Sequence, residues 1–181
     1  MRLPTLLLVL VAVALSGCTT APVPGAEPVT GFELDRYLGT WYEIARLDHT
    51  FERGLENVTA NYTLNDDGSV RVLNRGYDVD KGDWDTAVGR ARFQGDPGTA
   101  SLEVSFFGPF YAGYHVIDLD PEAQDYGHAL VVSSTRGFLW ILARQPELDG
   151  DTYDRLVARA AALGINTDGL IRVDHTPRDG A

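Results

Sequence analysis

From residue 39 onward, apolar and polar residues alternate with a period of two along most of the chain. In residues 58–65, Val, Ala, Tyr and Leu alternate strictly with Thr and Asn, and Asp66-Asp67-Gly68 follows as a hairpin signal. Runs of this kind recur at close spacing. They span residues 41–47, 58–65, 69–77, 86–94, 102–106, 114–119, 129–134 and 138–144. The pattern predicts an all-β fold of about eight antiparallel strands in hairpin order, either closed into a barrel or folded into a sandwich.

A helix is predicted after the last of these strands. Residues 115–119 and 138–143 are apolar on both faces, so their outer side must be covered. Asp149 or Asp151 can cap a helix that Gly164 ends. Residues at helical spacing form one apolar stripe along it, namely Tyr153, Leu156, Val157, Ala160 and Leu163. We therefore expect a C-terminal α-helix packed outside the last strands.

The remaining C-terminal sequence adds little beyond the helix. Residues 170–173 form a short apolar run that is long enough for one more strand at a sheet edge. The chain contains no internal repeat and no sign of a second domain. Residues 32–181 are therefore predicted as one domain, large enough to bury a sizeable core.

The N-terminus has the features of a bacterial lipoprotein signal. Arg2 precedes an unbroken apolar run at residues 6–15, which is too short to span a bilayer but has the length of a signal core. The next residues, Leu-Ser-Gly-Cys at 15–18, resemble a lipobox, in which small residues precede a cysteine that becomes acylated. We predict that residues 1–17 are a signal peptide and that Cys18 carries the lipid. An ordinary secretory signal is the alternative.

The residues after Cys18 bear on location. Thr19 and Thr20 follow it. In Gram-negative lipoproteins an Asp after the acylated cysteine resembles an inner-membrane retention signal, and no Asp stands here. We therefore expect a lipid-anchored protein of the outer membrane that faces the periplasm. Residues 18–31 are Pro-rich and weakly patterned, which predicts an extended tether between the acylated cysteine and the domain.

Charge and cysteine content exclude some classes of partner and any disulfide within the chain. Twenty-six acidic residues against 15 basic ones give a formal net charge of -11, which argues against a nucleic-acid partner and against docking on anionic lipid through a basic patch. Membrane attachment is therefore assigned to the N-terminal lipid. Cys18 is the single cysteine, so no disulfide within the chain is possible.

Three residues from two distant parts of the sequence carry a family resemblance. Gly39 and Trp41 stand at the start of the first strand, and Arg144 at the end of the eighth. In an up-and-down barrel these ends coincide, so Trp41 and Arg144 can stack in a cation–π contact of about 1–2 kcal/mol. This arrangement resembles the lipocalins, and more narrowly the outer-membrane bacterial lipocalins. The matching stretches are residues 37–46, 51–56, 104–111 and 139–144.

The resemblance implies an eight-stranded antiparallel up-and-down β-barrel with a C-terminal α-helix packed outside, whose floor is closed by Gly39, Trp41 and Arg144 without contact to ligand. The chain departs from the family at Asp118-Leu119-Asp120-Pro121, where lipocalins commonly carry a Thr-Asp-Tyr-like motif. Extra residues at 122–127 predict a longer turn. Whether the Asp118 carboxylate points into the lower cavity, which would make that part of the wall less apolar, stays open at this point.

Such a barrel is just wide enough to hold one small ligand. Several small residues fall on inward positions of two strands and should leave space, although a barrel filled by its own side chains is the alternative. By alternation, the candidate ligand-binding residues are Val58, Ala60, Tyr62, Val72, Ala87, Gly89, Ala91, Val104, Phe106, Tyr114, Val116, Val131, Trp140 and Leu142, with Val70 and Leu102 on the same wall.

Hairpin topology places four loops at the mouth of the barrel: residues 48–56, 79–83, 108–112 and 135–137. Aromatic and apolar residues in or beside two of them suit contact with lipid or a partner, unless they simply pack the rim. They are Phe51, Leu55, Phe106, Phe107, Phe110 and Tyr111. Three basic residues near the same end are candidates for a phosphate or carboxylate head group, namely Arg46, His49 and Arg53.

The resemblance implies binding, storage or transport of a hydrophobic ligand, most specifically a fatty acid or (lyso)phospholipid. At ~0.8 kcal/mol per methylene, a chain of about sixteen carbons offers on the order of 12 kcal/mol before ordering and association costs, which leaves roughly micromolar affinity. Head-group preference and a homodimer both stay open.

Other functions have weaker support. The histidines show no metal spacing and no nucleophile motif is present, so we predict no catalytic residue, no metal and no cofactor. A lipid-modifying enzyme is the first alternative, with Asp118 or Glu43 as its acid. A structural envelope protein with a filled barrel is the second. A haem or bilin is a third possible ligand for this fold, but no residue stands out as an axial ligand.

Overall fold

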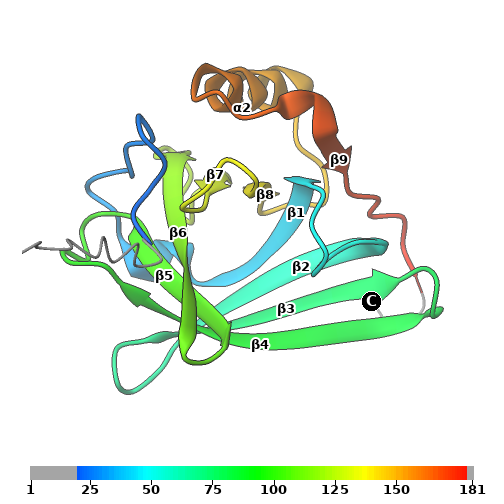
Figure 1. The fold of residues 1–181 in the computed structure, drawn as a ribbon, viewed down its shortest axis with the longest axis horizontal. Helices are drawn as coiled ribbons and strands as arrows, with labels where there is room; N and C mark the ends of the chain where they lie inside the picture. The colour runs from blue at the N-terminus through cyan, green and yellow to red at the C-terminus, as the bar shows by residue number, and fades with distance from the viewer. Residues whose placement is uncertain (1–19, 179–181) are drawn as a thin grey trace, which may run out of the picture.

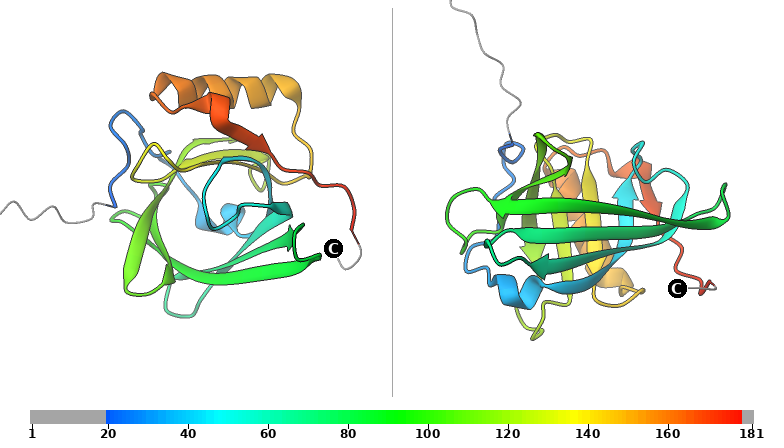
Figure 2. Two further views of the ribbon diagram at one scale, coloured as in Figure 1. Left: turned by 45° about the vertical axis from the view of Figure 1, so that its right-hand side comes forward. Right: turned by 90° about the horizontal axis from the view of Figure 1, so that it is seen from below.

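Eight antiparallel strands close into a barrel in the computed structural model, which describes residues 20–178 (Figure 1). Each strand pairs with the next in sequence, and β1 pairs with both β2 and β8, so the strands form a closed ring (Figure 2, left). The predicted up-and-down barrel is confirmed. The strands are β1 (Gly39–Leu47), β2 (Leu55–Leu64), β3 (Val70–Asp78), β4 (Asp83–Phe93), β5 (Ser101–Phe107), β6 (Phe110–Leu119), β7 (His128–Val132) and β8 (Leu139–Ala143).

One end of the barrel, which we call the floor, is where β1 begins and β8 ends. The short helix α1 (Leu34–Tyr37) leads into it. Trp41 is fully buried there, and the Arg144 guanidinium carbon lies 4.0 Å from its ring centroid, the contact that the sequence predicted. Arg144 also donates hydrogen bonds to the backbone carbonyls of Arg36, Thr40 and Asp125. The opposite end is the mouth.

The helix α2 (Gly150–Ala162) lies over the outer face of β7, β8 and β1 (Figure 1). The Asp149 carboxylate caps it by accepting a hydrogen bond of 2.8 Å from the Thr152 amide. Leu156 and Ala160 are completely buried in a cluster with strand residues such as Ile141. A 3-10 turn, η1 (Thr167–Gly169), then leads to β9 (Leu170–Arg172), which pairs with β1. Neither α1 nor α2 is long and apolar enough to cross a membrane.

Two β-bulges decide which side chains face inward. The pairing of β1 with β8 shifts between Glu43 and Ala45, and that of β6 with β7 shifts between Val116 and Asp118. A bulge places two consecutive residues on one face of a strand. Ile44 and Ala45 accordingly both pack in the outer cluster under α2. Glu43 lies on the inward face by plain alternation from Trp41, and the shift after it brings Arg46 to the same side.

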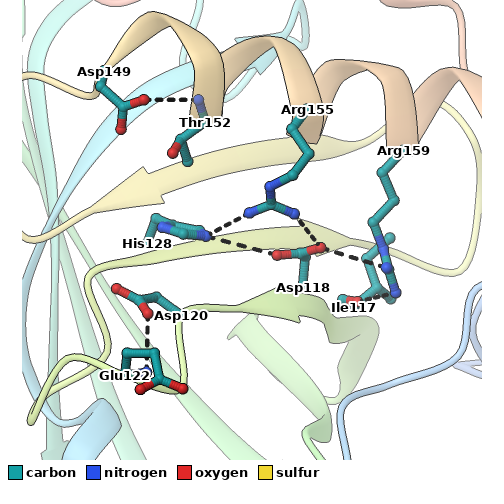
Figure 3. A network of polar contacts seen from close by, with 9 residues as sticks. All are labelled: Ile117, Asp118, Asp120, Glu122, His128, Asp149, Thr152, Arg155 and Arg159. Carbon is teal, nitrogen blue, oxygen red and sulfur yellow. Dashed lines mark hydrogen bonds and ion pairs between the residues drawn. The ribbon is translucent and has the colours of Figure 1, made fainter.

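The second bulge turns Asp118 outward, which decides the direction that the sequence left open. Its carboxylate accepts a hydrogen bond of 2.9 Å from Arg155 and lies 3.5 Å from the Arg159 guanidinium, both on α2 (Figure 3). His128 lies 3.7 Å away on the neighbouring strand. Burial alone would raise the pKa of Asp118, but these partners lower it overall. Asp118 therefore helps to hold α2 against the barrel.

The longer turn predicted after β6 lies at the floor. It covers residues 120–127, and Arg36 of α1 holds it through hydrogen bonds to the carbonyls of Pro121, Ala123 and Gln124. The Arg36 guanidinium also lies 4.0 Å from the ring centroid of Tyr126. These contacts tie the inserted residues to α1 and close that side of the floor.

Residues 20–31 pack against the barrel, so the described part of the predicted tether is not a free spacer. The Thr20 carbonyl contacts His115 Nε2 at 2.8 Å and accepts a hydrogen bond of 3.0 Å from Gln94. Val29 exchanges backbone hydrogen bonds with β6 and with the turn before β5, while Val23 and Ala26 are buried. The predicted signal peptide, residues 1–17, and Cys18 lie outside the described residues.

Candidate ligand-binding site

A cavity of about 630 Å³ occupies the barrel between the floor and the mouth. This size suits one small ligand. Most of its wall is apolar, and most of the residues selected by alternation contribute to it. They are Val58, Ala60, Tyr62, Val70, Val72, Ala87, Ala91, Leu102, Val104, Phe106, Tyr114, Trp140 and Leu142.

Three predicted lining residues do not reach the cavity. An added Cβ at Gly89 would lie 2.8 Å from the Phe106 ring, so that ring fills the space which the glycine was expected to leave open. Val116 and Val131 are completely buried in the same cluster as Trp41, below the cavity. The alternation rule identified their face correctly, but not their depth.

The lower wall of the cavity ends in three tyrosines. The Tyr114 hydroxyl lies 2.7 Å from that of Tyr37 and 2.8 Å from that of Tyr62, so the three hydroxyls hydrogen-bond one another. Burial raises the pKa of each, which keeps them neutral. Sequence alternation found Tyr62 and Tyr114 but missed Tyr37, because it comes from α1 rather than from a strand.

Near the mouth, one side of the cavity is polar. Glu43 of β1 and His49 and Glu52 of the β1–β2 loop line it, and each has at most 8% of its surface exposed. Arg46 lies behind them and is 2% exposed. We call these four residues the polar wall.

The polar wall is held by close contacts. Arg46 Nη1 donates to Glu43 Oε1 at 2.7 Å, and Arg46 Nη2 donates to the backbone carbonyls of Glu52 and Leu55. The Trp140 indole donates to Glu52 Oε2 at 3.0 Å, and His49 Nε2 lies 2.9 Å from the same oxygen. The wall thus fixes the β1–β2 loop over β1 and β8.

The two carboxyl groups have different pKa values. Burial and the neighbouring Glu52 charge raise the pKa of Glu43 to about 8, although Arg46 opposes this. Burial would also raise the pKa of Glu52, but the His49 and Trp140 contacts and the Arg46 charge outweigh it and lower that pKa. At neutral pH, Glu43 is therefore protonated and Glu52 is charged.

The three basic residues predicted to meet a head group differ in their position and their partners. Arg46 is committed to Glu43 and two carbonyls and does not line the cavity. Arg53 is exposed and pairs with Asp48 at 2.7 Å. His49 alone lines the cavity. Sequence reasoning did not include the inward carboxyl groups of the wall in the lining, although alternation from Trp41 places Glu43 on the inward face; Glu52 lies in a loop, where alternation gives no direction.

Three phenylalanines stand exposed at the mouth, and we call them the rim phenylalanines. Phe51 is 68%, Phe107 71% and Phe110 79% exposed, and all three also border the cavity. The alternative that the aromatic residues pack the rim therefore fails for these three, whereas Leu55, Phe106 and Tyr111 are half-buried. Of the four predicted mouth loops, those at 48–56 and 108–112 contribute to the cavity wall, whereas 79–83 and 135–137 do not.

Comparison with known proteins agrees with this geometry. Residues 32–175 match the family model described as a lipocalin-like domain. The chain is 48% identical over 172 residues to the outer membrane lipoprotein Blc of Citrobacter freundii, covering 94% of this chain and 96% of that protein. Identity to the Blc protein of Vibrio cholerae is 45%, covering 92% and 95%. These names support the location predicted from the N-terminus, a lipid-anchored protein of the outer membrane.

Solved structures support the same fold at lower identity. The chain matches insecticyanin from the tobacco hornworm Manduca sexta with a TM-score of 0.67 and 20% identity, covering 87% of this chain and 88% of that one. Lobster apocrustacyanin A1 matches with a TM-score of 0.60 and 16% identity, covering 86% and 94%. The family model, the Blc relatives and the closed barrel together place this chain in the lipocalin family.

Proposed function

We propose that the protein binds one lipid with a long acyl chain, a fatty acid or (lyso)phospholipid, inside the barrel and carries it in the bacterial envelope. The observation that supports this most directly is the apolar cavity of about 630 Å³. Burying about sixteen methylenes at ~0.8 kcal/mol each gives enough free energy for roughly micromolar binding after ordering costs. The same cavity contradicts the alternative of a barrel filled by its own side chains.

The mouth suits ligand exchange with a membrane. The rim phenylalanines expose apolar surface where the cavity opens, and such surface favours contact with lipid. The acylated Cys18 predicted from the lipobox would keep the domain beside its source of ligand, with the domain facing the periplasm. The outer-membrane Blc relatives support this anchoring.

Binding is favoured over catalysis because lipocalins are generally binding proteins. Asp118, one of the two acids considered for an enzyme, contacts α2 and not the cavity. Within residues 20–178, no group of three or more His, Cys, Asp or Glu side chains is arranged to hold a metal ion. Turnover of a lipid by the purified protein, abolished in Glu43→Gln, would support the enzyme instead.

The test is to extract the native protein, look for co-purifying lipid by mass spectrometry, and measure an acyl-chain fluorophore with Ala91→Trp. Ala91 lines the cavity, so the added indole should occupy the tail site and weaken binding at least about tenfold. Val88→Trp is the matched control, because Val88 lies on the same strand and is 54% exposed. It should bind normally. Unchanged affinity in Ala91→Trp would count against an interior site.

A further inference from the structure

His115 is a buried histidine that the cavity does not use. It lies on β6 and is completely shielded from solvent, whereas the next residue, Val116, belongs to the cluster inside the barrel. Residues 20–31 run beside β5 and β6 (Figure 1, blue), and Thr20 contacts the His115 ring. Burying a histidine is unfavourable unless its nitrogens are hydrogen-bonded, and an apolar residue would avoid that penalty. Its presence here indicates a role in holding the N-terminal segment.

Thr20 is the residue that joins this segment to three strands. Its carbonyl oxygen lies 2.8 Å from His115 Nε2 on β6 and accepts a hydrogen bond of 3.0 Å from Gln94, which follows β4. Its hydroxyl donates to Glu103 Oε2 of β5 at 3.1 Å. We call these contacts of Thr20 with Gln94, Glu103 and His115 the clasp.

The clasp depends on a glycine in β6. A Cβ added to Gly113 would lie 2.5 Å from the Thr20 carbonyl oxygen, from His115 Nε2 and from Ser134 Oγ. Any side chain at this position would therefore displace Thr20 or the groups around it. Gly113 lets the N-terminal backbone approach the strand closely enough for the clasp to close.

The hydrogen bonds of His115 suit the neutral ring. Because a carbonyl oxygen only accepts, Nε2 carries the hydrogen and donates to Thr20. Nδ1 lies 3.0 Å from the Ser101 hydroxyl and accepts from it. A second proton on Nδ1 would break that hydrogen bond and place a charge in a buried site. Burial accordingly lowers the pKa of His115 below its ordinary value of 6.5, although the Thr20 carbonyl opposes this.

The charged groups nearest to the clasp are already paired with each other. From β5, Glu103 accepts hydrogen bonds from Thr20 and, at 2.6 Å, from Arg92 of β4. Its charge is thus shared between two donors. Among the described residues, His115 itself forms no ion pair. A proton on His115 would therefore have no countercharge of its own.

The other elements around the ring are uncharged. The strand β7 and the turn after it contribute Val132 and Ser134. On β6, the Tyr114 hydroxyl belongs to the cavity and stays neutral. Within residues 20–31 the one charged side chain is Glu27, which is exposed and forms no ion pair in the part of the chain that the structure describes. His115 is therefore the group whose protonation would open the clasp.

We propose that the clasp is an acid-sensitive release, in which protonation of His115 frees residues 20–22 from the barrel and lengthens the tether to a lipid on Cys18. This goes beyond the proposed function, and its tether part rests on the predicted acylation. Val23 is 3% exposed, so the release would stop there. Three freed residues add about 10 Å of reach.

The direction of the pH effect follows from the pKa of His115. This pKa is lowered in the closed clasp, so the closed state holds fewer protons than the open one. The clasp is therefore fully stable above pH 6.5, the ordinary value, and weakens as pH falls below it through the lowered pKa.

The experiment uses the full acylated chain in liposomes, with a nitroxide spin label on Ala21→Cys. Acylation blocks Cys18, the single native cysteine, so only the introduced thiol reacts. Ala21 is exposed and adjoins Thr20, so the label reports the state of the clasp. Electron paramagnetic resonance then measures the mobile fraction of the label from pH 7.5 to pH 5. We expect this fraction to rise at least about fivefold, with a midpoint below pH 6.5.

Three variants locate the effect. His115→Gln keeps an amide that can donate to the Thr20 carbonyl but does not titrate, so the label should stay immobile throughout. His128→Gln is the matched control, because His128 contacts Asp118 and Arg155 instead of the N-terminal segment. It should keep the acid transition. Gly113→Ala should open the clasp by steric contact and give a mobile label at both pH values.

A second measurement tests the tether. Neutron reflectometry of the acylated protein on a supported bilayer gives the distance between the barrel and the bilayer. This distance should increase by up to about 10 Å between pH 7.5 and pH 5, and it should stay constant in His115→Gln.

The outcomes separate the parts of the proposal. An equally immobile label at both pH values, or an acid transition that survives in His115→Gln, would overturn the clasp. A mobile label with an unchanged distance to the bilayer would overturn the lengthening of the tether. Affinity for the acyl fluorophore should be the same in His115→Gln as in the parent, so lipid binding is tested independently.

Discussion

The floor and the polar wall both contain buried polar groups, but they differ in how completely these groups are hydrogen-bonded. At the floor, the Trp41 indole donates to the Tyr37 carbonyl at 2.8 Å, and Arg144 reaches three backbone carbonyls. At the wall, two carboxyl groups stand close together, and His49 Nδ1 and Arg46 Nε are buried without a hydrogen-bond partner. The floor satisfies its own hydrogen bonds and so supports stability. The wall leaves part of its hydrogen-bonding capacity unused.

The largest expected effect comes from breaking the floor. Trp41→Ala removes a completely buried ring and the contact of Arg144 with it, so the free energy of unfolding should fall by ~3–5 kcal/mol. Urea unfolding followed by circular dichroism measures this. Trp84→Ala is the control, since Trp84 is only partly buried on β4, and it should lose much less. A similar loss in both would mean that the floor has no special role.

The polar wall should make the free energy of unfolding depend on pH. Because the folded protein raises the pKa of Glu43 to about 8 from an ordinary value of 4.5, the folded state binds more protons than the unfolded chain between these values. Stability is therefore highest below this range and falls as pH rises through it, by roughly 3 kcal/mol between pH 5.5 and 8.5. Urea unfolding at pH 5.5 and 8.5 measures the fall, which Glu43→Gln should remove. An equal fall in the variant would contradict the assignment.

A conservative substitution at the floor tests whether the floor acts on stability alone and not on ligand binding. Arg144→Lys keeps the charge but loses the planar group that stacks on Trp41 and reaches three carbonyls, so the unfolding free energy should fall by ~1–2 kcal/mol. Affinity for an acyl fluorophore should not change, because Arg144 does not line the cavity. A loss of affinity without a loss of stability would place Arg144 in the binding site.

The smallest effect on stability is expected at the rim. Phe110 is 79% exposed, so Phe110→Ser should change the unfolding free energy by less than ~0.5 kcal/mol. It should nonetheless slow the uptake of a fluorescent lysolipid from vesicles, measured by stopped-flow fluorescence. Val79→Ser, at the same end but away from the cavity, is the control. Equal rates for both variants would remove the rim from the exchange route.

Sequence patterns predicted most of the fold because the period of two and the helical stripe are local signals. The strands and α2, capped by Asp149, one of the two aspartates considered, were found in this way. The stacking of Trp41 with Arg144 was expected from the up-and-down topology and the family resemblance. Two gaps have different causes. The bulge in β6 breaks the period of two and turns Asp118 outward. Plain alternation from Trp41 already places Glu43 inward, but the predicted lining left out acidic residues.

Other errors came from long-range packing. No nearby residue shows that Phe106 covers Gly89, or that Val116 and Val131 lie below the cavity. The Pro-rich composition of residues 20–31 indicated an extended chain, but its contacts with His115 and Gln94 are distant in sequence. Composition describes how a segment behaves alone, and here the barrel provides it with partners.

The packed N-terminal segment also limits the distance between a membrane anchor and the barrel. Thr20 is already fixed to the barrel wall, and Cys18 precedes it by two positions, which span at most ~7 Å when fully extended. A lipid on Cys18 would therefore hold the barrel against the bilayer surface instead of letting it swing at a distance. Cargo exchange would then take place close to the bilayer, and a soluble acceptor would have to approach that surface.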